Sequence, residues 1–367
     1  MAKNNACERI KKTFQGKNMV VGYALGNRKD QEADIDVLAE DAENAITYSK
    51  STTVCLYDYF TSYQKLLVPY STIRAVKQAR QYGAREVIYS ATDRPHRYQQ
   101  IKSLLELWGF GSYTSYLYTV TELGFLEGLL PVMDVGFLGP DEMRALSEIT
   151  SLMRVPIESL DSFQQVEHQL IDRKLLRQYR LKNLEWASKL KIPTATGFVI
   201  GSDLYESNIS KWLDTILDLH DEFGLIHELR LEVFREDLNL RKVKGKVPSK
   251  SEIVDVIKRV RSVLPDSITV NLPIEVLVKD VKAFIKAGIR DFGSIDLDCE
   301  TRSKDPVDLQ ALSEKVDDLG FTLQQRFPLK KKFILEEKYS KKLGQVFDAY
   351  RYKIRKDLQE KQKDSRT

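Results

Sequence analysis

Cysteine is scarce in this sequence of 367 residues, which contains three. They are Cys7, Cys55 and Cys299. Because they are odd in number and far apart, they do not form a disulfide framework, and this favours a reducing compartment. We therefore expect a cytoplasmic protein.

Histidine is almost as rare. The four histidines are His96, His168, His220 and His227. No H-x-x-x-H or H-x-x-E-H spacing occurs among them, so a metal site built on histidine is not expected.

Long apolar runs and a strong charge bias are also missing. No segment approaches the roughly 18 apolar residues of a membrane span, and the amino terminus has no sustained apolar region, so we expect neither a membrane-spanning nor a secreted protein. The 57 basic and 53 acidic residues leave a net charge of +4, too little for a nucleic-acid-binding surface over the whole molecule. No G-x-G-x-x-G follows a predicted strand and no phosphate loop is present, which counts against a nucleotide-binding open sheet.

Short apolar or β-branched segments recur along the chain and predict eight strands. They cover residues 52–59, 86–91, 128–135, 152–159, 194–201, 228–235, 267–273 and 290–296. Segments with helical period lie between them, among them residues 71–83, 209–224 and 251–264, and several open with Ser and close with Gly. Alternating strands and helices predict an α/β fold, a closed (β/α)8 TIM-type barrel, with an open doubly wound sheet as the alternative.

The ends of the chain differ from the middle. We expect a short polar lead-in over residues 1–40, the barrel over residues 41–328 and a basic helical tail over residues 329–367. In the tail, apolar residues recur at helical spacing: Leu343, Val346, Phe347, Tyr350, Ile354 and Leu358. This pattern predicts a helix packed on the barrel, and the alternative is a tail that binds a partner or RNA.

In such barrels the loops at the carboxyl ends of the strands build the site. Those positions are rich in carboxylates: Asp134, Glu158, residues 232–235, Glu275 and residues 296–300. Cys55 lies there too, and the first and eighth strands are neighbours in a closed barrel, so Cys55 and Cys299 are able to approach each other. The alternatives are a solvated loop for the carboxylates at 296–300 and a small buried apolar residue for Cys55.

Glu158 is the carboxylate with the strongest reason for a role. It ends an apolar strand just after Pro156, and a carboxylate at a barrel mouth requires either a ligand or an ion-pair partner.

Several segments, in order and at family-like spacing, resemble one family. They are ITYSK followed by Cys55, EVIYSATDRP, LLPVMDVGFL, VPIESLD, IPTATGFVIGS, LHDEFGLIHELRLEVFR, ITVNLPIEV, AGIRDFGSID and LGFTLQQRFPL. The sequence resembles the first subunit of FO synthase (CofG type; 7,8-didemethyl-8-hydroxy-5-deazariboflavin synthase), a radical S-adenosylmethionine barrel enzyme. The resemblance implies deazaflavin synthesis from tyrosine and 5-amino-6-ribitylaminouracil with a second subunit, started by a 4Fe-4S cluster that cleaves S-adenosylmethionine.

The family holds its cluster with C-x3-C-x2-C after the first strand, because three soft thiolates bind three irons and leave the fourth for S-adenosylmethionine. Here that frame reads Cys55, Tyr59 and Ser62. Cys55 is thus the remaining metal ligand of the motif, and we expect the bulky Tyr59 to fill part of the former cluster space.

Other motifs implied by the resemblance are altered as well. The family's G-D-x-P-E turn reads Thr92-Asp93-Arg94-Pro95-His96, and its G-I-G-E segment reads Gly201-Ser202-Asp203-Leu204. The Q-N-F and P-P-N-L segments read EVF at residues 232–234 and PIEV at residues 273–276, whereas Glu158, Asp291 and Gly293 stay in place. If an S-adenosylmethionine-like pocket is retained, the resemblance assigns it to Glu158, Asp93 and Gly201.

Three functions remain open. The first is a cluster-lacking paralogue without the cofactors, with a binding or regulatory role, paired with a second FO synthase subunit or a catalytic paralogue. The second is an active radical enzyme with a remodelled 4Fe-4S centre held by Cys55, Cys299 and an outside ligand. The third is a different barrel enzyme that uses Glu158, Asp134 and Glu275 as acid and base.

Overall fold

Within the residues that the structure describes, nine parallel strands form the centre of the protein. The computed structural model describes residues 44–58, 66–167, 171–203, 205–236, 240–296, 307–326 and 329–364. The strands are β1 (Ala45–Tyr57), β2 (Glu86–Ala91), β3 (Leu130–Asp134), β4 (Leu152–Arg154), β5 (Thr194–Ile200), β6 (Ile226–Val233), β7 (Thr269–Asn271), β8 (Asp291–Asp296) and β9 (Thr322–Gln325).

The strands run in the order β7-β6-β5-β4-β3-β2-β1-β8, every pair is parallel, and β9 adds to the first part of β1. β7 and β8 pack beside each other at the seam of a nearly closed barrel. The expected α/β barrel of TIM type is therefore confirmed, and the open doubly wound sheet is not adopted.

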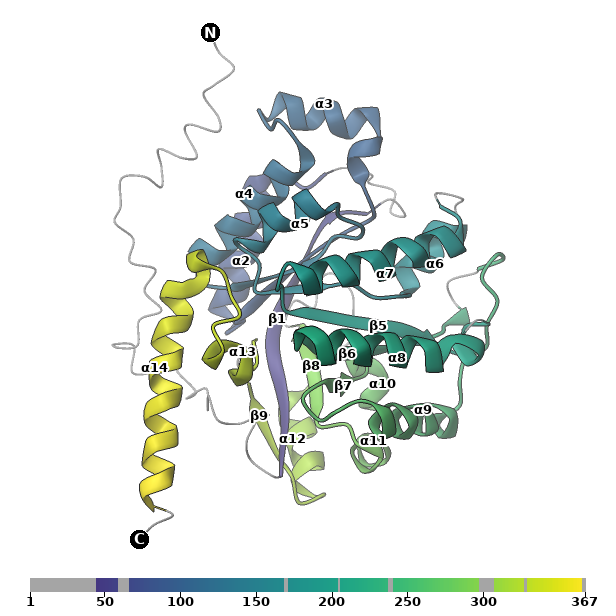
Figure 1. Ribbon diagram of the computed structural model, residues 1–367, viewed down its shortest axis with the longest axis vertical. Coiled ribbons are helices and arrows are strands. Elements are labelled where there is room, and N and C mark those ends of the chain that lie inside the picture. The colour runs from purple at the N-terminus through teal and green to yellow at the C-terminus, as the bar shows by residue number, and fades with distance from the viewer. Residues whose placement is uncertain are drawn as a thin grey trace.

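Helices cover the outside of this barrel (Figure 1). They are α2 (Pro69–Gln81), α3 (Gln99–Leu107), α4 (Tyr113–Leu126), α5 (Pro140–Ser147), α6 (Leu160–Glu167), α7 (Arg173–Lys189), α8 (Tyr205–Phe223), α9 (Lys250–Val263), α10 (Ile274–Leu277), α11 (Val281–Ala287), α12 (Leu309–Asp317), α13 (Lys331–Leu335) and α14 (Lys341–Asp364), with a 3-10 turn, η2 (Pro95–Arg97). The predicted helices 71–83, 209–224 and 251–264 are α2, α8 and α9. None of the helices in the described ranges is both long and apolar enough to cross a bilayer.

All eight predicted strands are present, and β1 differs most from its prediction. It begins at Ala45 and not at residue 52, because its first half alternates small polar residues with apolar ones. Thr47, Ser49 and Ser51 are buried even so, and the Thr47 hydroxyl donates to a carboxylate of β8, Asp291, at 2.6 Å. A strand whose inner face is polar has few apolar residues in its sequence, so the first residues of β1 were not predicted as strand.

The carboxyl-terminal helices pack at the end of the barrel where the strands begin. Leu130, the first residue of β3, and Leu225, which precedes β6, share an apolar cluster with the buried side chains of α13 and α14. The predicted apolar stripe Leu343, Val346, Phe347, Tyr350 and Ile354 belongs to this cluster. The predicted helix thus packs on the barrel, along one side of the molecule in Figure 1.

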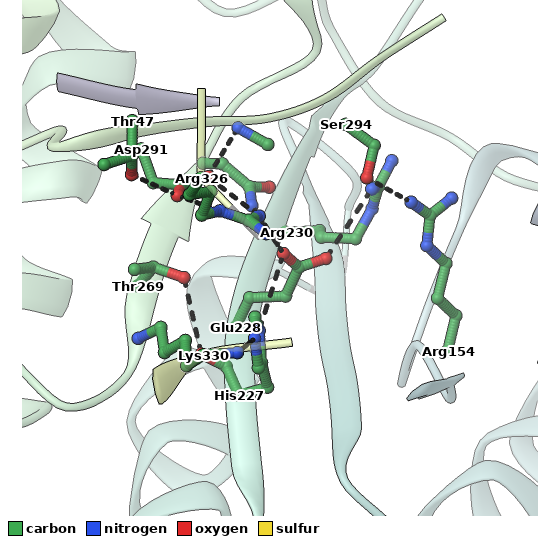
Figure 2. A network of polar contacts seen from close by, with 12 residues as sticks. Thr47, Arg154, His227, Glu228, Arg230, Thr269, Asp291, Ser294, Arg326 and Lys330 are labelled. Carbon is green, nitrogen blue, oxygen red and sulfur yellow. Dashed lines mark hydrogen bonds and ion pairs between the residues drawn. The ribbon is translucent and has the colours of Figure 1, made fainter. Parts of the chain in front are cut away.

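The barrel interior combines one apolar patch with a network of charges. Ile88, Val132, Leu152 and Ala195 form the patch on β2 to β5, where a TIM barrel usually has branched apolar side chains in every layer. Arg326, which directly follows β9, is 2% exposed and donates to Asp291 of β8 at 2.5 and 3.2 Å. Its guanidinium also lies 3.6 Å from Glu228 of β6 (Figure 2).

The balance of forces on Asp291 sets its charge. Burial alone raises the pKa of a carboxyl, but the Arg326 guanidinium, with the hydrogen bonds from Thr47 and the Gly293 N–H, outweighs burial and lowers the pKa of Asp291. Asp291 is therefore ionised, and its pair with Arg326 joins β8, β9 and β1 from inside the barrel.

We expect Asp291→Asn to lower the free energy of unfolding by roughly 3–5 kcal/mol, because the substitution leaves the buried Arg326 charge unpaired. A depressed carboxyl pKa stabilises the fold above the unfolded-state value near ~3.9, and this contribution disappears as the pH falls through the folded-state pKa. The free energy of unfolding of the variant should therefore fall less on acidification than that of the wild type, because asparagine does not titrate. Urea unfolding at pH 7 and at pH values below about 4 measures both effects.

The matched control is Asp141→Asn, which removes an exposed carboxylate paired with Arg144. We expect it to change the free energy of unfolding by no more than about 0.5 kcal/mol. Equal effects of the two substitutions would contradict a structural role for the buried pair.

Candidate functional site

Glu158 lies at the mouth of the barrel, just beyond β4, and is 3% exposed. Arg173, the first residue of α7, donates to its two carboxylate oxygens at 3.1 and 3.2 Å. Arg177, one turn further along α7, lies 3.7 Å from the carboxylate, and the Ser202 hydroxyl donates to it at 3.4 Å. Burial raises the pKa of Glu158, and the two guanidiniums only partly offset this. The structure therefore gives Glu158 an ion-pair partner inside the protein.

Asp93, in the loop after β2, is held in the same manner from the same helix. Arg180 of α7 donates to both of its oxygens, at 3.2 and 3.3 Å, and the Phe137 N–H donates to it at 2.5 Å. A Cβ added to Gly136 would come within 1.7 Å of the carboxylate, so this close approach requires glycine. The two carboxylates expected at an S-adenosylmethionine-like pocket are both paired with arginines of α7.

Gly201, the third residue expected at that pocket, follows β5 with φ +87°. A Cβ there would lie 2.3 Å from the Lys246 carbonyl oxygen, and the Lys246 N–H donates to the Gly201 carbonyl at 2.9 Å. The backbone that approaches Gly201 is therefore the chain's own segment before α9.

Cys55 is exposed near the end of β1, between the buried Val54 and Leu56. Its interpretation as a small buried apolar residue is wrong, because β1 pairs irregularly with β2 between Cys55 and Tyr57 and the side chain stays accessible. Its motif partners Tyr59 and Ser62 lie outside the described residues, as does Cys299, so the approach of the two cysteines remains a prediction. Across the described ranges, no three His, Cys, Asp or Glu side chains are grouped to hold a metal.

The cluster that the family resemblance implies does not fit the donor set of the motif. A three-thiolate site requires three soft, deprotonated ligands, and the frame Cys55, Tyr59, Ser62 supplies one thiol. A phenol and a hydroxyl are hard donors that do not replace thiolates in such a site.

The residues that sequence reasoning missed line the interior. On β6 the lumen positions are Glu228, Arg230 and Glu232, alternating with Leu229, Leu231 and Val233. A strand of a closed parallel barrel is usually apolar on both faces, so this alternation of charge was a readable signal of a polar lumen. Arg154 of β4, 8% exposed, and Arg326 had no such signal.

A small cavity of about 40 Å³ opens among these side chains at the mouth. Its lining residues are Asp134, Arg154, Pro156, Glu158, Ser159, Asp161, Ala195, Thr196, Gly197, Arg230 and Glu232. Two of the three residues proposed for acid and base chemistry, Glu158 and Asp134, line it, whereas Glu275 lies on α10 and does not.

Glu232 is a lining group of this cavity whose acidity is clearly altered. Its carboxylate accepts the N–H of Leu160, the first residue of α6, at 2.7 Å. Burial raises the pKa of Glu232 to about 7; the Leu160 hydrogen bond opposes this and nearby Asp161 adds to it. Glu232 therefore changes its charge near neutral pH.

A second, larger cleft of about 80 Å³ lies between the loop after β2 and α7. Arg94 has φ 48° and places its guanidinium 4.2 Å from the centre of the Phe137 ring, which in turn packs on Tyr179. A left-handed arginine held over an aromatic ring gives this cleft an aromatic floor and a positive edge.

Comparison with known proteins gives relatives and a fold neighbour. The chain is 28% identical over 295 residues to a 7,8-didemethyl-8-hydroxy-5-deazariboflavin synthase of Methanothermobacter thermautotrophicus, with 77% of this chain and 87% of the relative covered. It is 24% identical over 321 residues to the synthase of that name from Archaeoglobus fulgidus, with 83% and 96% covered. No family model matches. Among solved structures, the FeFe-hydrogenase maturase HydG of Carboxydothermus hydrogenoformans shares the fold, with a TM-score of 0.57 and 15% identity over 88% of this chain and 80% of that one.

For Glu232 we expect an unusual pH dependence of stability. A carboxyl whose folded-state pKa is raised destabilises the fold as the pH rises from the unfolded value near ~4.3 to about 7. Glu232→Gln keeps an acceptor for the Leu160 N–H and removes this penalty, so we expect it to raise the free energy of unfolding at pH 8 by about 1–3 kcal/mol and to have little effect at pH 4. Urea unfolding across pH 4–8 tests this, and parallel curves for the two proteins would contradict the raised pKa.

Proposed function

We propose that this protein is a cluster-lacking paralogue of the CofG-type 7,8-didemethyl-8-hydroxy-5-deazariboflavin synthases, the family to which the chain belongs. In this proposal the protein keeps the family barrel as a cytoplasmic binding or regulatory protein and does not start radical chemistry. Its partner is a second FO synthase subunit or a catalytic paralogue.

The observation that carries the proposal is the pairing of the mouth carboxylates with α7. Glu158 receives two hydrogen bonds from Arg173, and Asp93 receives two from Arg180. A carboxylate whose oxygens already accept charge-assisted hydrogen bonds from a buried guanidinium binds a ligand hydroxyl poorly, because such pairs are strong and costly to break. This arrangement favours a mouth that has been closed against S-adenosylmethionine.

The cluster motif supports the same conclusion independently. Of the three ligand positions only Cys55 is a cysteine, and the two positions that follow it hold a phenol, Tyr59, and a hydroxyl, Ser62. Loss of two thiolates removes the means of holding three irons. The altered cluster frame and the pairing of the mouth carboxylates with α7 are both expected if the fold was kept and the catalysis was not.

The alternative is an active radical lyase of deazaflavin synthesis with a remodelled cluster. The exposure of Cys55 favours it, because an accessible thiol at the end of β1 remains able to bind iron. It requires Cys299 and a ligand from outside the motif, and with it the cofactors 4Fe-4S and S-adenosylmethionine.

Anaerobic reconstitution with iron and sulfide separates the two functions. We expect the wild-type protein to bind less than one iron per chain after desalting and to show no absorption near ~400 nm, because one thiolate does not hold a cluster. The control is Tyr59→Cys combined with Ser62→Cys, which restores the C-x3-C-x2-C frame and should take up more iron. About four irons in the wild-type protein would contradict the proposal and support the alternative.

A further inference from the structure

Two arginines meet inside the barrel, and the carboxylate beside each lies at ion-pair distance but beyond hydrogen-bond distance. Arg154 comes from β4 and Arg230 from β6, and Figure 2 shows their side chains on either side of Ser294 of β8. The side chain of Arg154 is 7% exposed and that of Arg230 is 31% exposed. Burial, and then the neighbouring Arg230 charge, lowers the pKa of Arg154. Neighbouring like charges inside a protein are unfavourable unless anions lie near them, and Glu228 acts on both arginines.

The nearby carboxylates form ion pairs with these arginines, and the buried Glu86 adds a further negative charge near Arg154. Asp134 lies 3.9 Å from Arg154, and Glu228 lies 3.7 Å from Arg230, both beyond hydrogen-bond distance. Glu228 is shared with Arg326, at 3.6 Å, and accepts a hydrogen bond from Asn271.

Arg154 leaves part of its donor capacity unused. Within the described part of the chain, one of its terminal nitrogens donates to the Ser294 hydroxyl at 3.1 Å, and its Nε is buried without a partner. An arginine carries five N–H donors in a fixed fork that matches a planar or tetrahedral oxyanion.

These donors border the cavity of about 40 Å³ described above. A cavity needs roughly 10–15 Å³ to hold one water molecule, so this cavity has room for a few waters or for one small oxyanion group. Four acidic residues, Asp134, Glu158, Asp161 and Glu232, line the same cavity. An occupant must therefore direct its negative oxygens at the arginine donors and present no negative charge to these acidic side chains.

We propose that Arg154 and Arg230 bind the oxyanion group, a carboxylate or a sulfate-like group, of a small ligand that enters the barrel at the carboxyl ends of the strands. The inference rests on the binding role proposed above, for which it names the ligand chemistry. Gly197 of β5, which lines the cavity, lets the two backbones approach closely: its Cβ, if present, would lie 2.2 Å from the Arg230 carbonyl oxygen. The arginine backbone is thus fixed close to β5, and its side chain crosses the lumen toward Ser294.

The charge of Glu232 modulates this site. The charged groups that face it are Asp161 of α6, Asp134 of β3 and Arg230 of its own strand. An ionised Glu232 repels an anion in the cavity, and a protonated one does not, so anion binding should strengthen as the pH falls from 8 to 6. Glu232→Gln should remove this pH dependence and bind the anion at pH 8 as tightly as the wild type does at pH 6.

The test uses acetate and sulfate as probes, since neither titrates between pH 6 and 8. Isothermal titration and thermal melts of the full chain at constant ionic strength, with chloride as the replaced ion, measure binding. We expect at least one probe to raise the melting temperature above the chloride control. We expect Arg230→Gln to weaken its binding roughly ten- to hundredfold, the usual effect of losing a hydrogen bond to a charged group.

Arg230 is the first choice for substitution because it is the more exposed of the pair, and Arg230→Lys, which keeps the charge but not the fork, should weaken binding less. The matched control is Arg144→Gln. Arg144 lies on α5, its side chain is 66% exposed, and it does not line the cavity, so this substitution should leave anion binding unchanged. Equal binding by Arg230→Gln and the wild type, or no stabilisation beyond chloride by either probe, would overturn the anion site.

The iron content of the same samples tests the proposed function separately. Anion binding lost in Arg230→Gln supports the site whatever the iron content is. An iron-free protein that binds neither probe overturns the anion site alone, whereas four irons per chain overturn the cluster-lacking role alone.

Discussion

The ion pair of Arg326 with Asp291 inside the barrel is the interaction on which the rest of the interior depends. Two charges are taken out of water, and the cost of their desolvation is recovered only with good geometry and further hydrogen bonds. Thr47 and the Gly293 N–H supply these to the carboxylate. Once this pair occupies the start of the lumen, neighbouring positions cannot be filled by an ordinary apolar core.

That constraint extends toward the mouth through Glu228. Its carboxylate lies between Arg326 and Arg230, so the second guanidinium is directed across the lumen, where it meets Arg154 beside Ser294 (Figure 2). At the mouth, α7 contributes Arg173 and Arg180, which pair with the carboxylates after β4 and β2. The lumen thus contains the positive charges of Arg154 and Arg230, while the mouth carboxylates Glu158 and Asp93 are already paired with arginines of α7. Both features lead to our proposal of a binding protein for a small anion.

Much of the fold was predictable from sequence because strands and helices of a barrel have strong apolar periods. Residues 86–91 and 194–201 were predicted as β2 and β5 nearly to the residue, since both strands are continuous apolar or small-residue runs. The start of β1 was missed because its inner face is Thr47, Ser49 and Ser51. Glu158 was expected to need either a ligand or an ion-pair partner, and the structure gives it Arg173. Arg173 was not foreseen, because the partner depends on how α7 packs over the mouth.

The interior network was harder to predict. Asp291 and Arg326 are separated by 35 residues, and only the addition of β9 beside β1 brings them together. The alternation of Glu228, Arg230 and Glu232 was visible in the sequence, yet its meaning required knowing which face of β6 points inward. The frame of Cys55, Tyr59 and Ser62 could be read without any structure, because it concerns the identity of the donors and not their placement.

The formation of 5′-deoxyadenosine from S-adenosylmethionine tests the central proposal most directly. The protein would be reconstituted anaerobically with iron and sulfide, supplied with a strong reductant and S-adenosylmethionine, and its products separated by chromatography. We expect no 5′-deoxyadenosine above the amount formed without protein. Reductant-dependent formation that disappears in a Cys55→Ala variant would contradict a cluster-lacking role and assign radical chemistry to this barrel.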